Sequence, residues 1–290
     1  MTGSTRPGDL AYLNGEIVPT DRARVPLLDR GYLYGEGLFE TMRSYGGRIF
    51  ARDRHLARLR SSAAELGLEF GVGEDDLAQA LALTLEANRL ADAYLRLTVS
   101  EQCDAPGIEA RSGRFSISII ARALEMRAAP PPPVTAITLH PGSAPAAALA
   151  RHKTLSFLAY IRARAAARRG AVDEALLLNC AGEITEATTA NVFFVIDGRL
   201  VTPSVECGLL PGITRAVVLD LARAQGIEAV ERRVLPAELG MCSECFLTNS
   251  IVELQPVTRI DGRPIGAGDP GPAWSALARA YARTVAASGA

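Results

Sequence analysis

Apolar positions in the first third of the chain recur with the period of a helix. Residues 53–67 and 75–90 each place leucines and alanines on one face, and the first of these segments ends at Gly67. This spacing predicts two amphipathic helices. Short apolar runs also flank the turn residues at 13–15 and Gly46-Gly47. Both predict tight hairpins, because asparagine and glycine adopt the backbone angles that such turns need.

The hydrophobic period changes to two in residues 93–100, which read AYLRLTVS. Leucine and valine face one way there, while Tyr94 and Arg96 face the other, and this alternation predicts a strand. Residues 114–122 predict a second strand. The polar face of the first strand is either half-exposed to solvent or lines a polar site, and the pattern leaves both open.

Four consecutive prolines at 130–133 divide the chain. A proline run cannot join a helix or a central strand and behaves as a stiff, extended spacer. We therefore expect an N-terminal domain over residues 1–128, a Pro-rich linker over 129–134 and a C-terminal domain over 135–290.

The second part of the chain alternates predicted strands with predicted helices. Strands are expected at 134–139, 174–179, 191–196 and 244–249, a loop at 141–148, a helix within 209–226, and hairpin turns at Asp197-Gly198 and Asp261-Gly262. A further helix is expected after Lys153, with Leu155, Leu158, Ile161 and Ala165 on one face. Strands with interspersed helices in two parts predict an α/β or α+β fold.

Composition narrows the class of protein. An apolar content of 48% in 290 residues suffices for a sizeable core, and a net charge of -1 gives no electrostatic case for nucleic acid or an anionic membrane. No apolar run approaches membrane-spanning length, and the N-terminus lacks the apolar core of a secretory signal. Five scattered cysteines predict reduced thiols and a cytoplasmic location. Cys242 and Cys245 form a C-x-x-C without a second pair, so no metal site is expected.

Lys153 is the only lysine in the chain, and every other residue counted as lysine or arginine is an arginine. A buried lysine can lose its proton, whereas arginine cannot. A neutral amine attacks carbonyl groups and forms Schiff bases. An arginine-biased genome that left one surface lysine behind is the alternative explanation.

A Schiff-base lysine implies an aldehyde cofactor, of which pyridoxal phosphate is the common one. This cofactor needs an amine, an acid at its pyridine nitrogen, donors for its phosphate and room for the substrate. Gly212-Ile213-Thr214 precede an apolar helix, where free backbone N–H groups suit a phosphate. His55 and Arg58 lie one turn apart on the first helix, and Glu183 and Glu186 follow a turn into a buried strand. Each feature alone also fits an ordinary helix start or a solvated side chain.

Taken together, these segments resemble the fold-type IV pyridoxal-phosphate enzymes, or class IV aminotransferases. This family includes branched-chain aminotransferases, D-amino-acid aminotransferases and aminodeoxychorismate lyases. The resemblance covers roughly residues 10–265 in the family's order. Its motifs are D-R-G-Y-L-Y-G-E-G-L-F-E-T-M-R at 29–43, R-D-R-H-L-A-R-L at 52–59, K-T-L-S-F-L at 153–158, D-E-A-L-L-L at 173–178, G-E-I-T-E-A-T-T-A-N-V-F at 182–193, L-V-T-P at 200–203, L-L-P-G-I-T-R at 209–215 and F-L-T-N-S-I-V-E-L-Q-P-V at 246–257.

The resemblance implies an architecture and a set of roles. A smaller N-terminal α/β domain and a larger C-terminal pyridoxal-phosphate-binding domain would hold the cofactor at their interface, and the working unit would be a homodimer or a higher homo-oligomer. Lys153 matches the lysine that forms the Schiff base and shuttles the proton. Matches among the cofactor-binding residues are Glu186 at the pyridine nitrogen, Leu210 against the ring, and Arg58, Ile213, Thr214 and Ser250 at the phosphate. Asn191 matches a residue that holds a turn.

The substrate is harder to assign within the family. D-amino-acid aminotransferases and the lyases commonly carry an arginine after the central strand, where this chain reads Ser100-Glu101-Gln102, and a carboxylate there would repel a substrate carboxylate. Phe39, Tyr94 and Arg96 match the substrate side of branched-chain enzymes. Those enzymes usually have a tyrosine at the position of Leu158, so the match is incomplete.

We therefore expect a transaminase that moves an amino group from an amino acid, possibly L-branched-chain or aliphatic, to a 2-oxo acid. The alternatives are a lyase that eliminates pyruvate from 4-amino-4-deoxychorismate, and a transaminase for D-amino acids or (R)-amines. Among these alternatives only elimination proceeds without a keto-acid acceptor.

Overall fold

The computed structural model describes residues 9–125, 129–140 and 147–289. These residues form two compact units. One holds residues 9–125 together with Lys153–Ser156, and the other holds the described residues from 129 to 152 and Phe157–Ser288. The sequence prediction placed Lys153 in the C-terminal domain, whereas the structure groups it with the N-terminal unit. The reason is backbone pairing between this segment and a strand of the first unit, described below.

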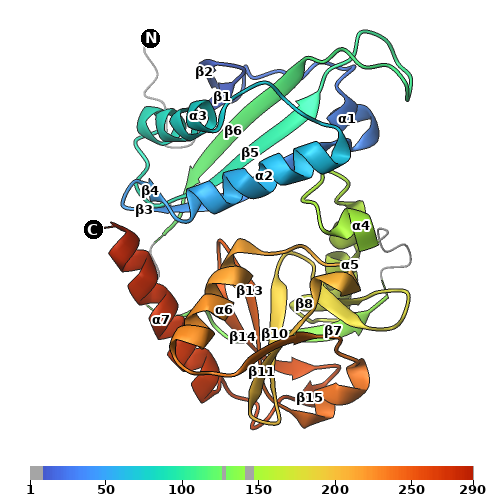
Figure 1. Cartoon of the computed structure of the whole chain (residues 1–290), viewed down its shortest axis with the longest axis vertical. Coiled ribbons are helices and arrows are strands. Elements are labelled where there is room, and N and C mark those ends of the chain that lie inside the picture. The colour runs from blue at the N-terminus through green and yellow to red at the C-terminus, as the bar shows by residue number, and fades with distance from the viewer. Residues whose placement is uncertain (1–8, 126–128, 141–146, 290) are drawn as a thin grey trace. The chain divides into compact units, whose positions relative to one another are not determined.

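The first unit is built on one six-stranded antiparallel sheet, in the order β2-β1-β6-β5-β3-β4. Its elements are β1 (Leu10–Leu13), β2 (Glu16–Pro19), α1 (Arg30–Tyr34), β3 (Gly37–Tyr45), β4 (Arg48–Ile49), α2 (Arg52–Leu66), α3 (Glu74–Ala87), β5 (Ala93–Glu101) and β6 (Phe115–Ala123). Helices α2 and α3 cover one face of the sheet (Figure 1). The two predicted helices and both predicted strands are confirmed.

The alternation in β5 explains which face the helices cover. Leu95 and Leu97 are fully buried in the core formed with α2 and α3, whereas Tyr94 and Arg96 are half-buried on the opposite face. The sheet therefore has one apolar face and one face that carries polar and aromatic side chains. The predicted hairpin at 13–15 joins β1 to β2, with Gly15 at a φ of 104° that only glycine adopts readily.

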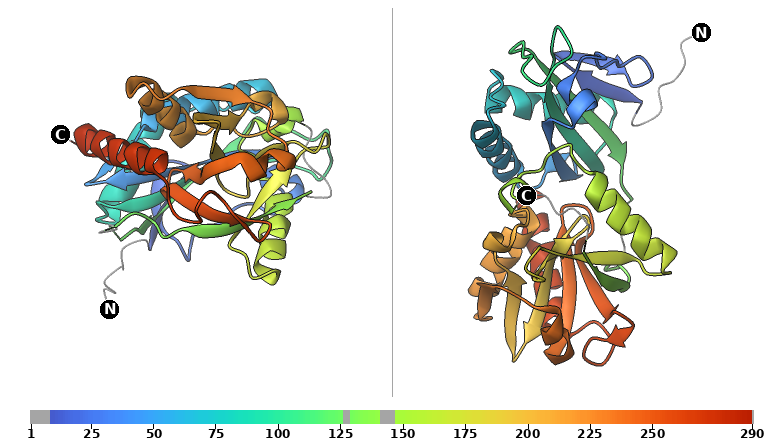
Figure 2. Two further views of the ribbon diagram at one scale, coloured as in Figure 1. Left: turned by 90° about the horizontal axis from the view of Figure 1, so that it is seen from below. Right: turned by 90° about the vertical axis from the view of Figure 1, so that its right-hand side faces the viewer.

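The second unit holds a nine-stranded mixed sheet, in the order β12-β11-β10-β13-β14-β7-β8-β9, with β15 paired to β14. Its strands are β7 (Val134–Leu139), β8 (Glu174–Leu178), β9 (Ile184–Ala187), β10 (Asn191–Ile196), β11 (Arg199–Pro203), β12 (Ala229–Arg232), β13 (Cys242–Asn249), β14 (Glu253–Ile260) and β15 (Arg263–Pro264). Its helices are α4 (Ala147–Ala150), α5 (Leu158–Arg169), α6 (Ile213–Ala224), α7 (Pro272–Gly289) and the short 3-10 turns η1 (Val205–Cys207) and η2 (Pro236–Met241). Helices α5 and α6 flank the strands (Figure 2).

The predicted strands of this unit are confirmed, and so are the turns at Asp197-Gly198 and Asp261-Gly262. Residues 141–146 of the predicted loop lie outside the described residues, and α4 begins directly after them. The predicted helix after Lys153 is confirmed, but Leu155 lies before it and the predicted apolar face is not the buried one. Helix α5 starts only at Leu158, and it packs on β7 and β8 through Ala163 and Ala167. Small side chains bring the helix close to the sheet, while Leu158 and Ile161 are exposed.

Candidate active site

The backbone of β3 positions Lys153. Phe39 N–H donates to the Lys153 carbonyl (2.9 Å), and Leu155 N–H donates to the Gly37 carbonyl (3.0 Å). Room for this approach comes from Gly31 and Gly37, because a Cβ on either would lie within 2.8 Å of Leu155 Cδ1. The two glycines therefore allow a segment distant in sequence to pair with the first residues of β3.

The Lys153 ammonium group lies over an aromatic ring. Its Nζ is 4.5 Å from the centroid of the buried Phe39 ring, and Arg96 Cζ is 3.6 Å from the same centroid. Both distances suit cation–π contacts. The three predicted substrate residues lie on β3 and β5, and one of them, Phe39, contacts both Lys153 and Arg96 through its ring. Tyr94 lies two residues before Arg96 on β5 and contacts Arg122, whose Cζ is 4.7 Å from the tyrosine ring centroid.

A buried ionic network lies beside this cluster. Glu40 is fully buried on β3 and accepts two hydrogen bonds from Arg58, from Nε at 2.8 Å and from Nη2 at 2.7 Å. His55 Nδ1 lies 2.7 Å from Glu40 Oε2. Burial raises the pKa of Glu40, but Arg58 and His55 outweigh it and lower that pKa to about 2. Burial lowers the pKa of His55, and the hydrogen bond and charge of Glu40 raise it only in part. The charges of Arg58 and Lys153 add to the lowering, so that pKa lies below its ordinary value. Arg58, the arginine predicted to bind the phosphate, thus has two of its guanidinium nitrogens hydrogen-bonded to Glu40.

The second unit carries the acid predicted to lie at the pyridine nitrogen. Glu186 is buried on β9; its Oε1 accepts from the Tyr160 hydroxyl (3.4 Å), and its Oε2 accepts from Asn191 Nδ2 (3.2 Å) and Leu210 N–H (3.2 Å). The three donors together fix the orientation of this carboxylate. The alternative acid, Glu183, accepts from Asn179 (2.8 Å) and forms an ion pair with Arg233 (3.3 Å).

Helix α6 begins next to Glu186 and presents backbone donors. Its N-cap residue is Gly212, which offers no side-chain acceptor, and the first helical hydrogen bond runs from Ala216 N–H to the Gly212 carbonyl. The amides of Ile213 and Thr214 therefore precede the first intrahelical bond, in the position where an anion binds favourably. Leu210 lies in the loop before this helix, and Ser250 lies in the turn after β13.

Sequence reasoning missed Tyr160. This tyrosine stacks on Phe157 (4.8 Å between centroids), and burial followed by the charge of Glu186 raises the pKa of its phenol. The family resemblance pointed instead to Leu158, which is exposed at the start of α5. No local pattern distinguished Tyr160, because its contact with Glu186 depends on how α5 packs against the sheet.

Glu101 is bound by the loop that follows β5. Its buried carboxylate accepts from Arg111 Nη1 (2.6 Å), Ser112 N–H (3.1 Å) and Gly113 N–H (3.0 Å). Burial raises the pKa of Glu101, but these donors outweigh it and hold that pKa below its ordinary value. This carboxylate therefore anchors the loop that follows β5.

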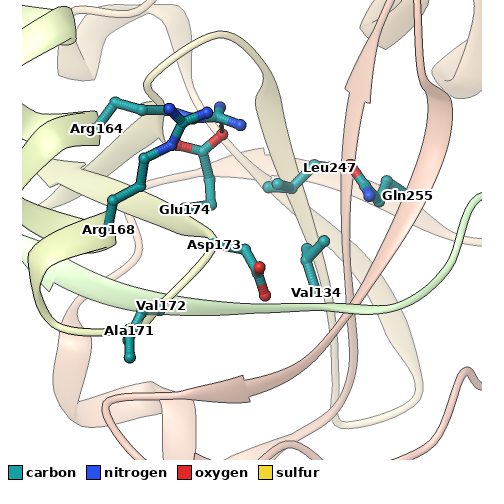
Figure 3. A pocket seen from close by; sticks show the side chains of 9 residues that line it. All are labelled: Val134, Arg164, Arg168, Ala171, Val172, Asp173, Glu174, Leu247 and Gln255. Carbon is teal, nitrogen blue, oxygen red and sulfur yellow. Dashed lines mark hydrogen bonds and ion pairs between the residues drawn. The ribbon is translucent and has the colours of Figure 1, made fainter.

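A cavity of about 400 Å³ lies in the second unit (Figure 3). Arg164 and Arg168 from α5 point into it beside Glu174, and the other lining residues are Val134, Ala171, Val172, Asp173, Leu247 and Gln255. None of the predicted site residues lines this cavity. Glu174 is already bound to Arg164 and Thr188.

The described residues contain no cluster of three or more histidine, cysteine or acidic side chains able to hold a metal ion. Cys242 and Cys245 are both buried, and burial raises the pKa of Cys242 to about 12 and that of Cys245 as well. Both thiols therefore stay protonated at neutral pH. Among the helices of the described ranges, none combines the length and apolar character needed to cross a membrane.

Comparison with known proteins identifies relatives over most of the chain. The family model for amino-transferase class IV matches residues 37–260. A putative branched-chain-amino-acid aminotransferase of Methanocaldococcus jannaschii is 37% identical over 262 residues, covering 88% of each chain. A D-alanine aminotransferase of Bacillus licheniformis is 30% identical over 89% of this chain and 91% of its own. Among solved structures, the T.th. branched-chain amino acid aminotransferase complexed with N-(5'-phosphopyridoxyl)-L-glutamate matches with a TM-score of 0.86 and 27% identity, covering 97% of this chain and 95% of that one.

Proposed function

Because the chain belongs to the class IV aminotransferases and is a pyridoxal-phosphate-dependent transaminase, we propose that it transfers the amino group of an L-branched-chain or other aliphatic amino acid to a 2-oxo acid. The observation that carries this proposal is the cluster of Lys153, Phe39 and Arg96. In it, an amine and a guanidinium each contact the same apolar ring. Such a site suits a substrate with an apolar side chain and a carboxylate.

The residues of both units fit the cofactor by their chemistry. Lys153 offers the amine, Glu186 offers a carboxylate held by three donors, and the amides of Ile213 and Thr214 offer sites for an anion. Bound pyridoxal phosphate supplies an electron sink for the pair of electrons left when the substrate loses its α-proton.

Each of these groups has a role under this proposal. Lys153 Nζ would hold the cofactor through its aldehyde and would carry the proton to and from the substrate α-carbon. Glu186 would keep a proton on the pyridine nitrogen, which would strengthen the electron sink. Arg58 and Ser250 would join the two amides in binding the phosphate, and Leu210 would pack against the ring. Glu40 fixes the plane of the Arg58 guanidinium, because it binds two of its nitrogens.

The proposal also concerns how the chain is divided. It divides the chain into an N-terminal domain over 1–128, a linker at 129–134 and a C-terminal domain over 135–290. By compactness, Lys153 and Arg58 belong to the first unit of the structure, and Glu186 and the start of α6 belong to the second.

Phe39 and Arg96 are the residues from which we infer the substrate class. The Phe39 ring suits a branched aliphatic side chain, and the Arg96 guanidinium suits the second carboxylate of an acidic amino-group donor or its 2-oxo acid. The T.th. relative was crystallised with a phosphopyridoxyl adduct of L-glutamate, which supports a dicarboxylate partner. Tyr94 extends the same strand, β5.

A homodimer is part of the proposal, and the exposed apolar side chains of the first unit support it. Leu27, Tyr32 and Ile108 are each more than 70% exposed. Tyr34 connects the two segments that carry them, because its hydroxyl accepts from Gly107 N–H (3.0 Å), and Arg30 donates to three carbonyls of the same loop. Exposed apolar surface of this kind marks a protein–protein contact. Ile108→Asp should shift the protein toward monomer in light-scattering chromatography, whereas Leu83→Asp on α3 should not.

A half-reaction tests the activity. The purified protein is loaded with pyridoxal phosphate, and its near-visible band is followed after L-leucine is added without a keto acid. Conversion to the pyridoxamine form supports the proposed donor. A band that ignores L-leucine but responds to D-alanine would reassign the substrate's handedness. Release of pyruvate from 4-amino-4-deoxychorismate without an acceptor would instead favour elimination.

The single lysine makes the cofactor attachment unusually simple to locate. Borohydride reduction of the loaded protein should fix one pyridoxyl group, and peptide mass spectrometry should find it at Lys153. The N-terminal amine is the internal control, and labelling there alone would refute the role of Lys153.

A further inference from the structure

Asn191 is the first residue of β10, and its side chain is buried. Its amide nitrogen donates to Glu186 Oε2 (3.2 Å) and to the Leu210 carbonyl (2.8 Å). Leu210 N–H donates in turn to the same Glu186 oxygen (3.2 Å). Glu186, Asn191 and Leu210 therefore form a closed set of three hydrogen bonds.

The amide oxygen of Asn191 faces the start of α6. A Cβ added to Gly212, the N-cap of this helix, would lie 1.9 Å from Asn191 Oδ1. No side chain larger than hydrogen fits there, because a real Cβ cannot approach an oxygen so closely. Glycine at 212 thus lets the chain pass directly over Asn191 on its way into the helix.

We propose that Asn191 is a positioning residue that sets the spacing between the Glu186 carboxylate and the N-terminus of α6. This inference rests on the proposed function, in which those two groups bind opposite ends of one cofactor. One rigid side chain holds the carboxylate with its nitrogen and packs against the helix start with its oxygen. The protein then binds the pyridine end and the phosphate end of the cofactor at a fixed distance from each other.

The proposal depends on both hydrogens of the Asn191 side-chain nitrogen, because each is donated to a different acceptor. Asn191→Asp keeps the size of the side chain but replaces that donor with an acceptor. The new carboxylate would face Glu186 and the Leu210 carbonyl, and like charges at this distance repel. Either the carboxylate or the loop at 209–212 must then move.

The chain offers a matched control in Asn88. This buried asparagine of the first unit also donates from one nitrogen to two acceptors, the carbonyls of Leu10 (2.9 Å) and Thr84 (2.8 Å). Asn88→Asp therefore makes the same chemical change at a buried position, in the unit that does not contain Glu186 or α6. Any effect on general stability should appear in both variants.

The first measurement compares two probes that differ only in the phosphate. Apo wild-type protein, Asn191→Asp and Asn88→Asp are each titrated with pyridoxal phosphate and with pyridoxal. In the wild type the phosphate should strengthen binding strongly. In Asn191→Asp this advantage, the ratio of the two dissociation constants, should fall about tenfold or more, as expected when one matched contact is lost. In Asn88→Asp the ratio should stay within about twofold of the wild type.

A compensating variant separates positioning from folding. In the double variant Glu186→Gln with Asn191→Asp, the new amide can donate to the new carboxylate, so part of the phosphate advantage should return. Activity should stay low, because the acid no longer sits at position 186. A merely unfolded site would not be rescued by a second substitution.

The second measurement needs no cofactor. Hydrogen exchange of the apo protein should be faster in the segment around Leu210 in Asn191→Asp, and unchanged there in Asn88→Asp. An unchanged exchange rate and an unchanged phosphate ratio in Asn191→Asp would overturn the proposal. Wild-type protein that binds neither probe would instead overturn the proposed function, and exchange at Leu210 would still decide the role of Asn191.

Discussion

Two buried carboxylates, one in each unit, are held in different ways. Glu40 is bound by the charged side chain of Arg58 and by His55, and its pKa falls to about 2. Glu186 accepts from a phenol, a carboxamide and a backbone amide. The guanidinium beside Glu40 neutralises its negative charge inside the protein, whereas the three donors to Glu186 orient the carboxylate and carry no net charge of their own.

The two environments suit a structural role for Glu40 and a ligand-binding role for Glu186. A neutralised charge is a structural element: Glu40 fixes Arg58, and its removal leaves a guanidinium poorly held. A carboxylate oriented by neutral donors is suited to a cationic group that arrives with a ligand, such as a protonated pyridine nitrogen. The comparison predicts that substitutions at Glu40 lower stability and loosen Arg58, whereas those around Glu186 leave stability largely unchanged and act on cofactor binding and chemistry.

The largest expected effect lies at Lys153, the proposed Schiff-base residue. Lys153→Ala should lower transamination by at least about 10³-fold, since it removes the amine and the group that moves the proton. Lys153→Arg keeps a cation over the Phe39 ring and should be equally inactive, because arginine does not deprotonate. Steady-state assays of both variants check this. Substantial turnover by either one would remove the central assignment.

The next effect tests the structural role of Glu40. Glu40→Gln should cost about 3 kcal/mol of unfolding free energy, because it removes the buried countercharge of Arg58. Urea unfolding of the apo protein measures this. The control is Glu228→Gln, which removes an exposed ion pair with Arg199 (3.6 Å) and should cost about 0.5 kcal/mol or less. Equal losses in the two variants would contradict the contrast between buried and exposed pairs.

The same network predicts the pH dependence of stability. Glu40 has a folded pKa of about 2 against an ordinary 4.5, so its contribution is complete above 4.5 and disappears as the pH falls toward 2. The folded pKa of His55 is below its ordinary 6.5, so the unfolded chain binds more protons there and stability again falls as the pH drops below 6.5. Wild-type stability should therefore decline on acidification, and Glu40→Gln should show a shallower decline below pH 4.5 when urea unfolding is repeated across this range. Parallel pH curves for the two proteins would argue against it.

The elements that were predictable from sequence are those determined locally. The period of two in β5 and the glycine-containing turns at 15 and 198 depend on neighbours in sequence, and the structure has them. The roles assigned to Lys153, Glu186 and the other matched residues came from family motifs and stay predictions. Contacts between distant elements had no local signal.

Three positions show what that lack of signal means physically. The buried face of α5 depends on two alanines that fit closely against β7 and β8, so larger apolar residues on the helix stay exposed. Glu101 was interpreted only through the repulsion it would exert on a substrate carboxylate, and the backbone amides of a later loop that bind it had no signal in the sequence. Tyr160 reaches Glu186 only because α5 packs where its ring meets the β9 carboxylate.

The smallest expected effect concerns Tyr160, one of the three uncharged donors to Glu186. Tyr160→Phe removes one hydrogen bond at 3.4 Å from Glu186 and keeps the stacking on Phe157, so it should cost about 1 kcal/mol in unfolding free energy. Tyr281→Phe in α7 is the matched control for loss of a buried hydroxyl. Pyridoxal phosphate affinity should fall several-fold in Tyr160→Phe alone, because Glu186 then keeps its other two donors but is oriented less firmly. Unaltered affinity would mean that Asn191 and Leu210 suffice to orient the carboxylate, and that the phenol contributes to packing only.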